Sequence, residues 1–124
     1  MDKMRSRRVL YAEDEFTNRR VIQLRLEKEG VECELAKNGV EALEKYRAGT
    51  FDMVILDYYM PSMNGDQVAL EIRKVDRTIP IIAITSDDAG AEYLQSCGVN
   101  EIIIKPLHGN STISRILDYL RDVE

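Results

Sequence analysis

Five short apolar runs alternate along the chain with segments that have the residue spacing of helices. Most of the runs are continuous, which is typical of strands buried on both faces of a parallel sheet. They lie at residues 9–12, 31–36, 53–56, 81–84 and 102–104. A strand followed by a helix and a second parallel strand forms a right-handed crossover. The alternation therefore predicts an α/β, doubly wound fold in which one five-stranded parallel sheet carries helices on both faces.

Local signals indicate where the helices begin and end. The first helix is predicted over residues 15–29, with Val21, Ile22 and Leu26 on its apolar stripe. Asn38 with Glu41 three residues later resembles a capping box at the start of the second helix. A short fourth helix is expected around residues 91–96. The last helix should carry an apolar stripe of Ile113, Ile116, Leu117 and Leu120.

Length and charge restrict the class of protein. A chain of 124 residues can bury about two-thirds of its unfolded surface, so residues 1–124 are expected to form one domain, with residues 1–7 frayed. The net charge of −5 argues against direct nucleic-acid binding and against an anionic membrane surface, because both need clustered basic side chains. The basic residues near the start form too short a cluster to change this: Lys3, Arg5, Arg7 and Arg8.

The two cysteines and the hydropathy pattern indicate a cytoplasmic protein. Cys33 and Cys97 are far apart and form no CxxC motif, so both are expected to be buried thiols in a reducing compartment. No apolar stretch approaches the length needed to cross a bilayer, and no signal-peptide core follows the basic start. We therefore expect no membrane insertion.

Polar side chains follow the predicted strands at the points where the strands end. Glu13 and Asp14 follow the first, Asp57 the third, Thr85 the fourth and Lys105 the fifth. The carboxyl ends of parallel strands share one edge of the sheet, where ligands of such folds bind. Three carboxylates, a hydroxyl and an ammonium at one edge are costly unless something binds there. A divalent cation together with a phosphoryl group fits this set of side chains.

The chemistry of these residue types supports that interpretation. Mg²⁺ prefers oxygen ligands, and Asp14 and Asp57 could supply them, with Glu13 binding directly or through water. Without metal, mutual repulsion should raise some of the carboxyl pKa values. Asp57 is the best candidate for a nucleophile, because it ends the most apolar strand. Lys105 and Thr85 could then contact phosphoryl oxygens as a point charge and a hydrogen-bond donor.

Together, these motifs resemble the receiver domain of two-component response regulators. The motifs are E-D-E after the first strand, ILDYYMPSMNG, a strand that ends in Thr85, and Lys105-Pro106. Their combination is highly specific and covers the chain from about Arg8 to Leu120. Two segments, Asn18-Arg19-Arg20-Val21 and Lys37-Asn38-Gly39, are more similar to receivers attached to hybrid sensor kinases.

The resemblance implies a flavodoxin-like strand order of 2-1-3-4-5 and a set of residue roles. Asp57 would accept a phosphoryl group from a sensor histidine kinase or a phosphotransfer protein. The implied cofactor is Mg²⁺, or Mn²⁺, held by Glu13, Asp14, Asp57 and the backbone carbonyl of Tyr59. Thr85 and Lys105 would contact the phosphoryl group. The domain would be a switch rather than an enzyme, assisting its own phosphorylation and dephosphorylation. Its surface would then change for an unknown downstream protein or for a dimer formed on phosphorylation.

Some positions depart from the family pattern or modulate it. Glu13 stands where Asp is commoner, so its metal contact could be indirect. Ile102 stands where Tyr or Phe is frequent, and the sequence leaves open whether an aromatic switch operates without that ring. Tyr59 and Asp87 occupy the two positions that flank the path of the hydrolytic water, and the bulk of Tyr59 is expected to lengthen the lifetime of the phosphoryl group.

Several alternatives remain at this point. The acidic residues alone could be solvated loop charges, and Thr85 could cap the following helix. An aspartyl-phosphate phosphatase or phosphotransferase would need a general acid two residues after Asp57, where Tyr59 stands. A flavodoxin-like FMN carrier would need a phosphate loop where E-D-E would repel phosphate, and a degenerate receiver would keep only the fold. The sequence does not distinguish a stand-alone regulator from an excised receiver or part of a hybrid kinase.

Overall fold

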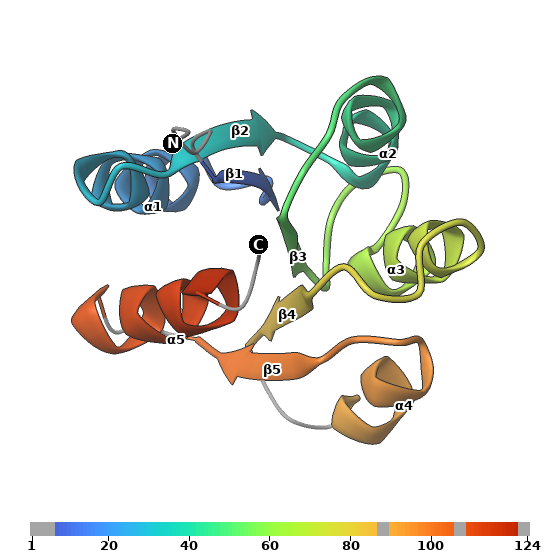
Figure 1. Ribbon diagram of the computed structural model, residues 1–124. Helices are drawn as coiled ribbons and strands as arrows, with labels where there is room; N and C mark the ends of the chain where they lie inside the picture. Colours follow the sequence, from blue (N-terminus) through green and yellow to red (C-terminus); the bar gives the residue numbers. More distant parts are fainter. Residues whose placement is uncertain (1–6, 87–89, 106–108, 122–124) are drawn as a thin grey trace.

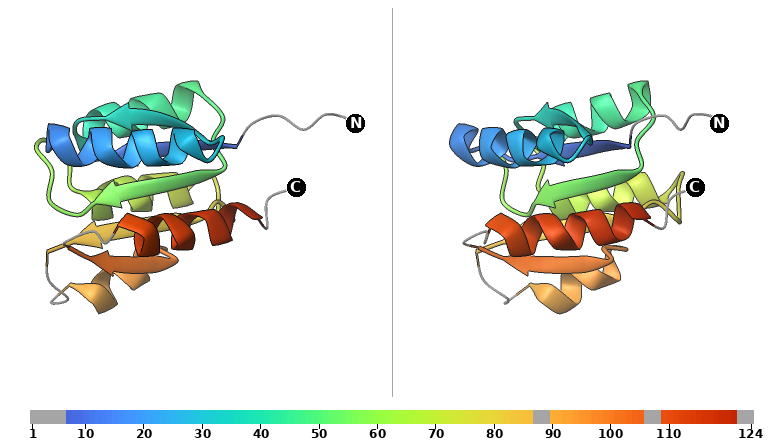
Figure 2. Two further views of the ribbon diagram at one scale, coloured as in Figure 1. Left: turned by 90° about the vertical axis from the view of Figure 1, so that its left-hand side faces the viewer. Right: turned by 60° about the vertical axis from the view of Figure 1, so that its left-hand side comes forward.

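The sheet has the predicted topology. The computed structural model describes residues 7–86, 90–105 and 109–121. Within them, five parallel strands pair in the order β2-β1-β3-β4-β5 (Figure 1). The strands are β1 (Arg8–Ala12), β2 (Glu32–Ala36), β3 (Met53–Asp57), β4 (Ile81–Thr85) and β5 (Glu101–Ile104). This arrangement confirms the α/β, doubly wound, flavodoxin-like fold and places the carboxyl ends of the strands at one edge (Figure 2).

Helices cover both faces of the sheet. α1 (Phe16–Lys28) and α5 (Gly109–Arg121) lie on one face, and α2 (Gly39–Ala48), α3 (Gly65–Arg73) and α4 (Ala91–Ser96) lie on the other (Figure 1). The short fourth helix has the bounds that the sequence predicts. None of the helices in the described part of the chain is long and apolar enough to cross a bilayer.

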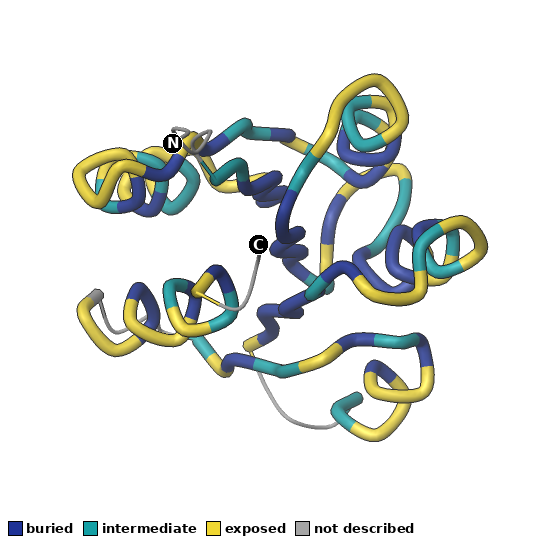
Figure 3. The backbone as a smooth tube through the Cα atoms, in the orientation of Figure 1, coloured by how far each residue is buried: buried dark blue, intermediate teal, exposed yellow. Residues whose placement is uncertain are grey.

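Two apolar clusters, one on each face of the sheet, form the core. Every residue of β3 and β4 is buried, as expected for central strands of a parallel sheet (Figure 3). Alternate residues of β1 enter different clusters: Leu10 packs on the α2–α3–α4 side, and Tyr11 packs on the α1–α5 side. The predicted apolar stripe of α1 is only partly correct, because Val21 is 48% exposed whereas Ile22 and Leu26 are buried.

Two of the local sequence signals act as predicted. The side chain of Asn38 accepts a hydrogen bond from the backbone N–H of Glu41 at 2.8 Å and so caps α2. Glu41 Oε1 in turn accepts from the N–H of Lys37 at 2.6 Å, one residue earlier than in a standard capping box. Cys33 and Cys97 are free and buried, as the sequence predicts.

A close backbone contact holds the start of α3 against the end of β3. The N–H of Gly65 donates to the carbonyl of Tyr58 at 2.8 Å. A Cβ atom at Gly65 would lie 2.4 Å from the carbonyl oxygen of Asp57, which is too close for any side chain. Glycine is therefore required here, and the contact fixes the loop that follows Asp57.

Replacing Gly65 with alanine should force the end of β3 and the start of α3 apart. We expect Gly65→Ala to lower the free energy of unfolding by about 1–3 kcal/mol, the usual cost of overpacking. Gly49→Ala is the matched control, since the nearest atom to its Cβ would be in the Phe51 side chain, at 3.3 Å, and no contact would be as close as the one at Gly65. Urea unfolding of both variants measures the difference, and equal losses would contradict this role of Gly65.

Candidate functional site

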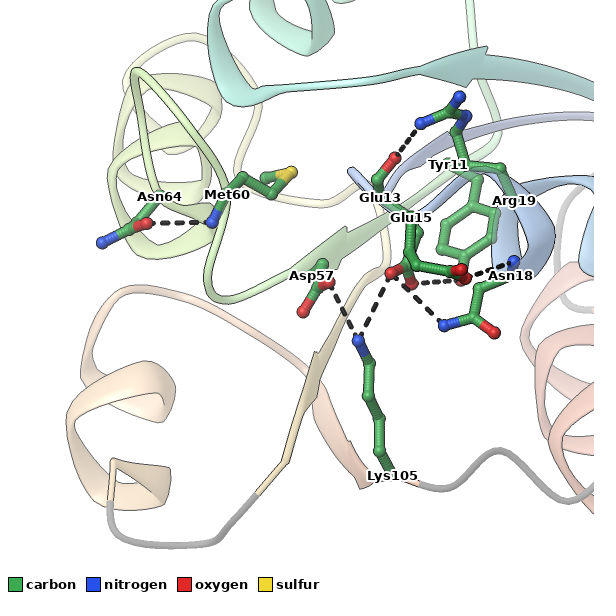
Figure 4. A network of polar contacts seen from close by, with 9 residues as sticks. All are labelled: Tyr11, Glu13, Glu15, Asn18, Arg19, Asp57, Met60, Asn64 and Lys105. Atoms are coloured by element: carbon green, nitrogen blue, oxygen red, sulfur yellow. Dashed lines mark hydrogen bonds and ion pairs between the residues drawn. The ribbon is translucent and has the colours of Figure 1, made fainter.

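The carboxyl edge of the sheet brings together the side chains that the sequence singles out. Lys105 Nζ lies 3.0 Å from Asp57 Oδ2 and 3.3 Å from Glu13 Oε2 (Figure 4). Asp14 also offers a carboxylate oxygen to this group. The residues come from the ends of β1, β3 and β5, which are neighbours or near neighbours in the sheet. Glu13 lies 44 residues before Asp57 in the sequence, and Lys105 lies 48 residues after it. The parallel topology therefore makes these distant residues direct neighbours.

The three carboxylates form a group that suits a hard cation. One oxygen of each of Glu13, Asp14 and Asp57 lies within 4.8 Å of the other two. Glu13 is fully buried and Asp57 is 3% exposed, whereas Asp14 is exposed and leaves the group open on one side. Oxygen ligands, negative charge and an open side are the properties of a magnesium site that keeps several waters and accepts a phosphate.

A second observation also points to a ligand. Thr85, the last residue of β4, is 1% exposed, and its hydroxyl oxygen has no hydrogen-bond partner among the described residues. An unsatisfied buried hydroxyl costs free energy, and such exceptions call for an explanation. The alternative in which Thr85 caps the next helix is wrong, because the N-cap of α4 is Gly90. The hydroxyl is thus free to bind an acceptor at the site.

Burial and charge control protonation at the site. Burial, together with the negative charge of Glu13, raises the pKa of Asp57 to about 7, although Lys105 opposes the shift. Burial lowers the pKa of Lys105, but hydrogen bonds and charge attraction from Asp57 and Glu13 outweigh this and leave the pKa raised. Lys105 therefore remains an ammonium ion and acts as the cation that joins the two acids.

Glu13 is held by groups that the sequence interpretation missed. The Tyr11 hydroxyl donates to Glu13 Oε1 at 2.9 Å, and Asn18 Nδ2 lies 3.5 Å from Glu13 Oε2 (Figure 4). Arg19 donates to the backbone carbonyl of Glu13 at 2.8 Å. The available signal was the spacing of Tyr11 and Glu13, since residues two apart on a strand point to the same face.

The remaining predicted residues lie around this centre. Tyr59 is 55% exposed, and its ring stacks on that of Tyr58 with centroids 4.5 Å apart. The role of the Tyr59 carbonyl as a metal ligand stays a prediction. Ile102 is half-buried and packs against the cluster on the α4 side of the sheet. Asp87 lies outside the described residues.

The loop after Asp57 is anchored from within. Asn64 Oδ1 accepts a hydrogen bond from the N–H of Met60 at 3.0 Å (Figure 4). At the neighbouring strand, the N–H of Tyr58 donates to the carbonyl of Ile84 at 2.7 Å. The backbone on both sides of Tyr59 is therefore tied to the sheet and to α3.

Comparisons with known proteins agree with this geometry. The family model of the response regulator receiver domain matches residues 9–117. The transcriptional regulatory protein ResD of Bacillus subtilis is 32% identical over 123 residues, which cover 98% of this chain and 51% of ResD. The chain spans about half the length of the first curated relatives it matches.

Solved structures show the same likeness. The response regulator TrrA from Thermotoga maritima, in complex with Mg²⁺-BeF, has a TM-score of 0.84 and 34% identity, covering 91% of this chain and 98% of TrrA. The receiver domain of a sensor histidine kinase from Pseudomonas aeruginosa has a TM-score of 0.82 and 27% identity, covering 92% of this chain and 96% of that domain. That structure has a magnesium ion coordinated in its active-site cleft.

The raised pKa of Asp57 leads to a prediction about stability. Between the ordinary value of 3.8 and about 7, Asp57 binds its proton more tightly in the folded than in the unfolded state. The contribution of Asp57 to the free energy of unfolding therefore falls steadily as the pH rises from about 4 to 7. Metal-free Asp57→Asn should be more stable than wild type at pH 7, and its advantage should shrink toward pH 4.

Urea unfolding in EDTA across this pH range measures the effect. The matched control is Glu44→Gln, which neutralises an exposed carboxylate on α2. An advantage of Asp57→Asn that is constant with pH, or equal to that of the control, would contradict the prediction.

Proposed function

This chain belongs to the response regulator receiver domain family, and on that premise we propose that Asp57 is its phosphoacceptor. Receiver domains are the switch domains of phosphorylation-based two-component signalling. The donor would be a sensor histidine kinase or a phosphotransfer protein, and residues 1–124 would act as one cytoplasmic receiver domain. The observation that carries the proposal is the buried Asp57 carboxylate, 3.0 Å from Lys105 and close to two further acids.

The proposed reaction is an in-line transfer. A carboxylate oxygen of Asp57 attacks the phosphorus, an O–P bond forms, and the N–P bond of the donor phosphohistidine breaks. Its electron pair stays on the imidazole nitrogen. Glu13, Asp14, Asp57 and the Tyr59 carbonyl would hold Mg²⁺ or Mn²⁺, which neutralises charge on the phosphoryl oxygens. This charge balance explains why so many acids stand beside the acceptor.

Lys105 and Thr85 would then respond to the new group. The Lys105 ammonium, now shared between Asp57 and Glu13, can pair with a phosphoryl oxygen. The Thr85 hydroxyl, for which the described residues offer no partner, can donate to another. Both residues end strands that lead toward α4 and α5. Their movement would bias the surface between two states and so alter binding to a downstream protein or a second copy of the chain.

The enzyme alternative lacks a general acid. The position two residues after Asp57 holds Tyr59, whose ring stacks on Tyr58 rather than carrying a carboxylate to the site. The FMN alternative conflicts with the acidic group, which would repel a bare phosphate in the absence of a cation. The switch function is therefore the better account of the geometry.

A phosphorylation assay tests the role of Asp57. Wild-type protein incubated with Mg²⁺ and acetyl phosphate should gain one phosphoryl group by intact mass. Asp57→Asn should gain none, because an amide is not a nucleophile of this kind, and EDTA should prevent the wild-type adduct. Glu44→Gln serves as the control and should react as wild type does. An adduct that survives Asp57→Asn would reject the assignment.

A second assay tests Tyr59. Its large side chain beside Asp57 should hinder the water that hydrolyses the acyl phosphate. Tyr59→Asn should therefore shorten the lifetime of the phosphorylated protein, measured as loss of label after removal of the donor. Tyr59→Phe keeps the ring and should decay as wild type does. Unchanged or slower decay in Tyr59→Asn would show that this side chain does not shield the site.

A further inference from the structure

We infer that Tyr11 is a positioning residue for the metal site, acting through Glu13. The inference rests on the proposed function and adds to it a residue that lies in the core rather than at the sheet edge. The Tyr11 hydroxyl holds the Glu13 carboxylate in one orientation, so that the second oxygen faces the Lys105 ammonium that Asp57 also binds. The pairing matters because glutamate has one more methylene than aspartate, and so one more rotatable bond to be fixed.

The geometry of β1 places the two side chains together. Tyr11 lies on β1, and Glu13 directly follows the strand two residues later, with its side chain beside Tyr11 and Asn18 of α1. The Tyr11 ring is fully buried in the apolar cluster on the α1–α5 side of the sheet, and its register partners are Leu35 and Ile55. A ring packed on all sides has little freedom, so its hydroxyl is a fixed donor, 2.9 Å from Glu13 Oε1 (Figure 4).

The two oxygens of Glu13 have different partners. Oε1 accepts from Tyr11, whereas Oε2 lies 3.3 Å from Lys105 Nζ and 3.5 Å from Asn18 Nδ2. Oε2 is therefore the oxygen that shares Lys105 with Asp57, and it is the one available to a cation or to a water bound to it. The hydroxyl of Tyr11 thus anchors Oε1, and Oε2 is the oxygen that acts at the site.

Anchoring is needed because Glu13 is both long and buried. A glutamate side chain has several rotamers to lose, and a fully buried carboxylate without hydrogen bonds is strongly unfavourable. The Tyr11 contact selects one orientation and satisfies one oxygen from inside the core. An aspartate at position 13 would end one methylene earlier and so would lose this contact.

Calorimetric Mg²⁺ titration of the full, unphosphorylated chain tests the inference. Tyr11→Phe removes only the hydroxyl and should weaken Mg²⁺ affinity by about 10-fold, the lower end of the effect of groups that orient metal ligands. In the Glu13→Asp background the same substitution should have little further effect, because the contact is already absent. Tyr46→Phe, a half-buried tyrosine outside this site, is the control and should bind as wild type does.

A spectroscopic measurement covers the case in which Tyr11→Phe does not fold. In wild-type protein labelled with ¹³C at the tyrosine Cζ atoms, the Tyr11 resonance should move during the Mg²⁺ titration. In Glu13→Asp it should not. Equal losses of affinity from Tyr11→Phe in both backgrounds, or a Tyr11 resonance that ignores Mg²⁺, would overturn the inference.

The outcomes separate this inference from the proposed function. Wild-type protein that binds no Mg²⁺ would overturn both. Normal Mg²⁺ affinity in Tyr11→Phe, together with normal phosphorylation of Asp57, would overturn the role of Tyr11 alone.

Discussion

Repulsion between buried carboxylates at the carboxyl edge of the sheet is the constraint on which the site depends. Two unit charges 4 Å apart interact by about 4 kcal/mol at an effective dielectric constant of 20, so Glu13 and Asp57 oppose each other strongly. Burial, and after it the negative charge of Glu13, raises the pKa of Asp57, in line with this cost. The two apolar clusters pack on the two faces of the sheet, and the α1–α5 cluster reaches the charged edge through the Tyr11 hydroxyl, which hydrogen-bonds Glu13. The site is thus built to gain free energy when positive charge arrives.

Lys105 offsets the repulsion between Glu13 and Asp57, and its side chain is the group that a new anion at the site would move. Its ammonium joins Glu13 and Asp57, while its backbone N–H donates to the carbonyl of Thr85 at 2.8 Å. The backbone contact fixes the ends of β4 and β5 to each other. A new anion near Asp57 would therefore redirect the side chain of Lys105 without separating the strands, so the response begins with side chains at the edge of the sheet.

The sequence predicts the fold, and the meeting of the charged side chains at the edge of the sheet, because each depends on a simple regularity. Strand and helix alternation determines the parallel sheet, and the sheet determines that Glu13, Asp57 and Lys105 meet. Contacts that depend on side-chain reach were not predictable in the same way. The bond from Tyr11 to Glu13 needs a rotamer choice, and the Gly65 approach to Asp57 needs the path of a loop. Val21 was misplaced because α1 has apolar residues on more than one side.

Thr85 shows how a fixed backbone can carry a movable side chain. Its carbonyl accepts a hydrogen bond from the Lys105 N–H and the residue is almost fully buried, yet its hydroxyl has no partner within the described parts of the chain. Threonine is branched at Cβ, so a rotation of about 120° about χ1 carries the hydroxyl into another staggered position and moves the methyl group with it. Such a rotation toward a phosphoryl oxygen would satisfy the hydroxyl without opening a large cavity. A ligand that accepts a hydrogen bond from the Thr85 hydroxyl would therefore satisfy it, and the surrounding structure would need to move very little.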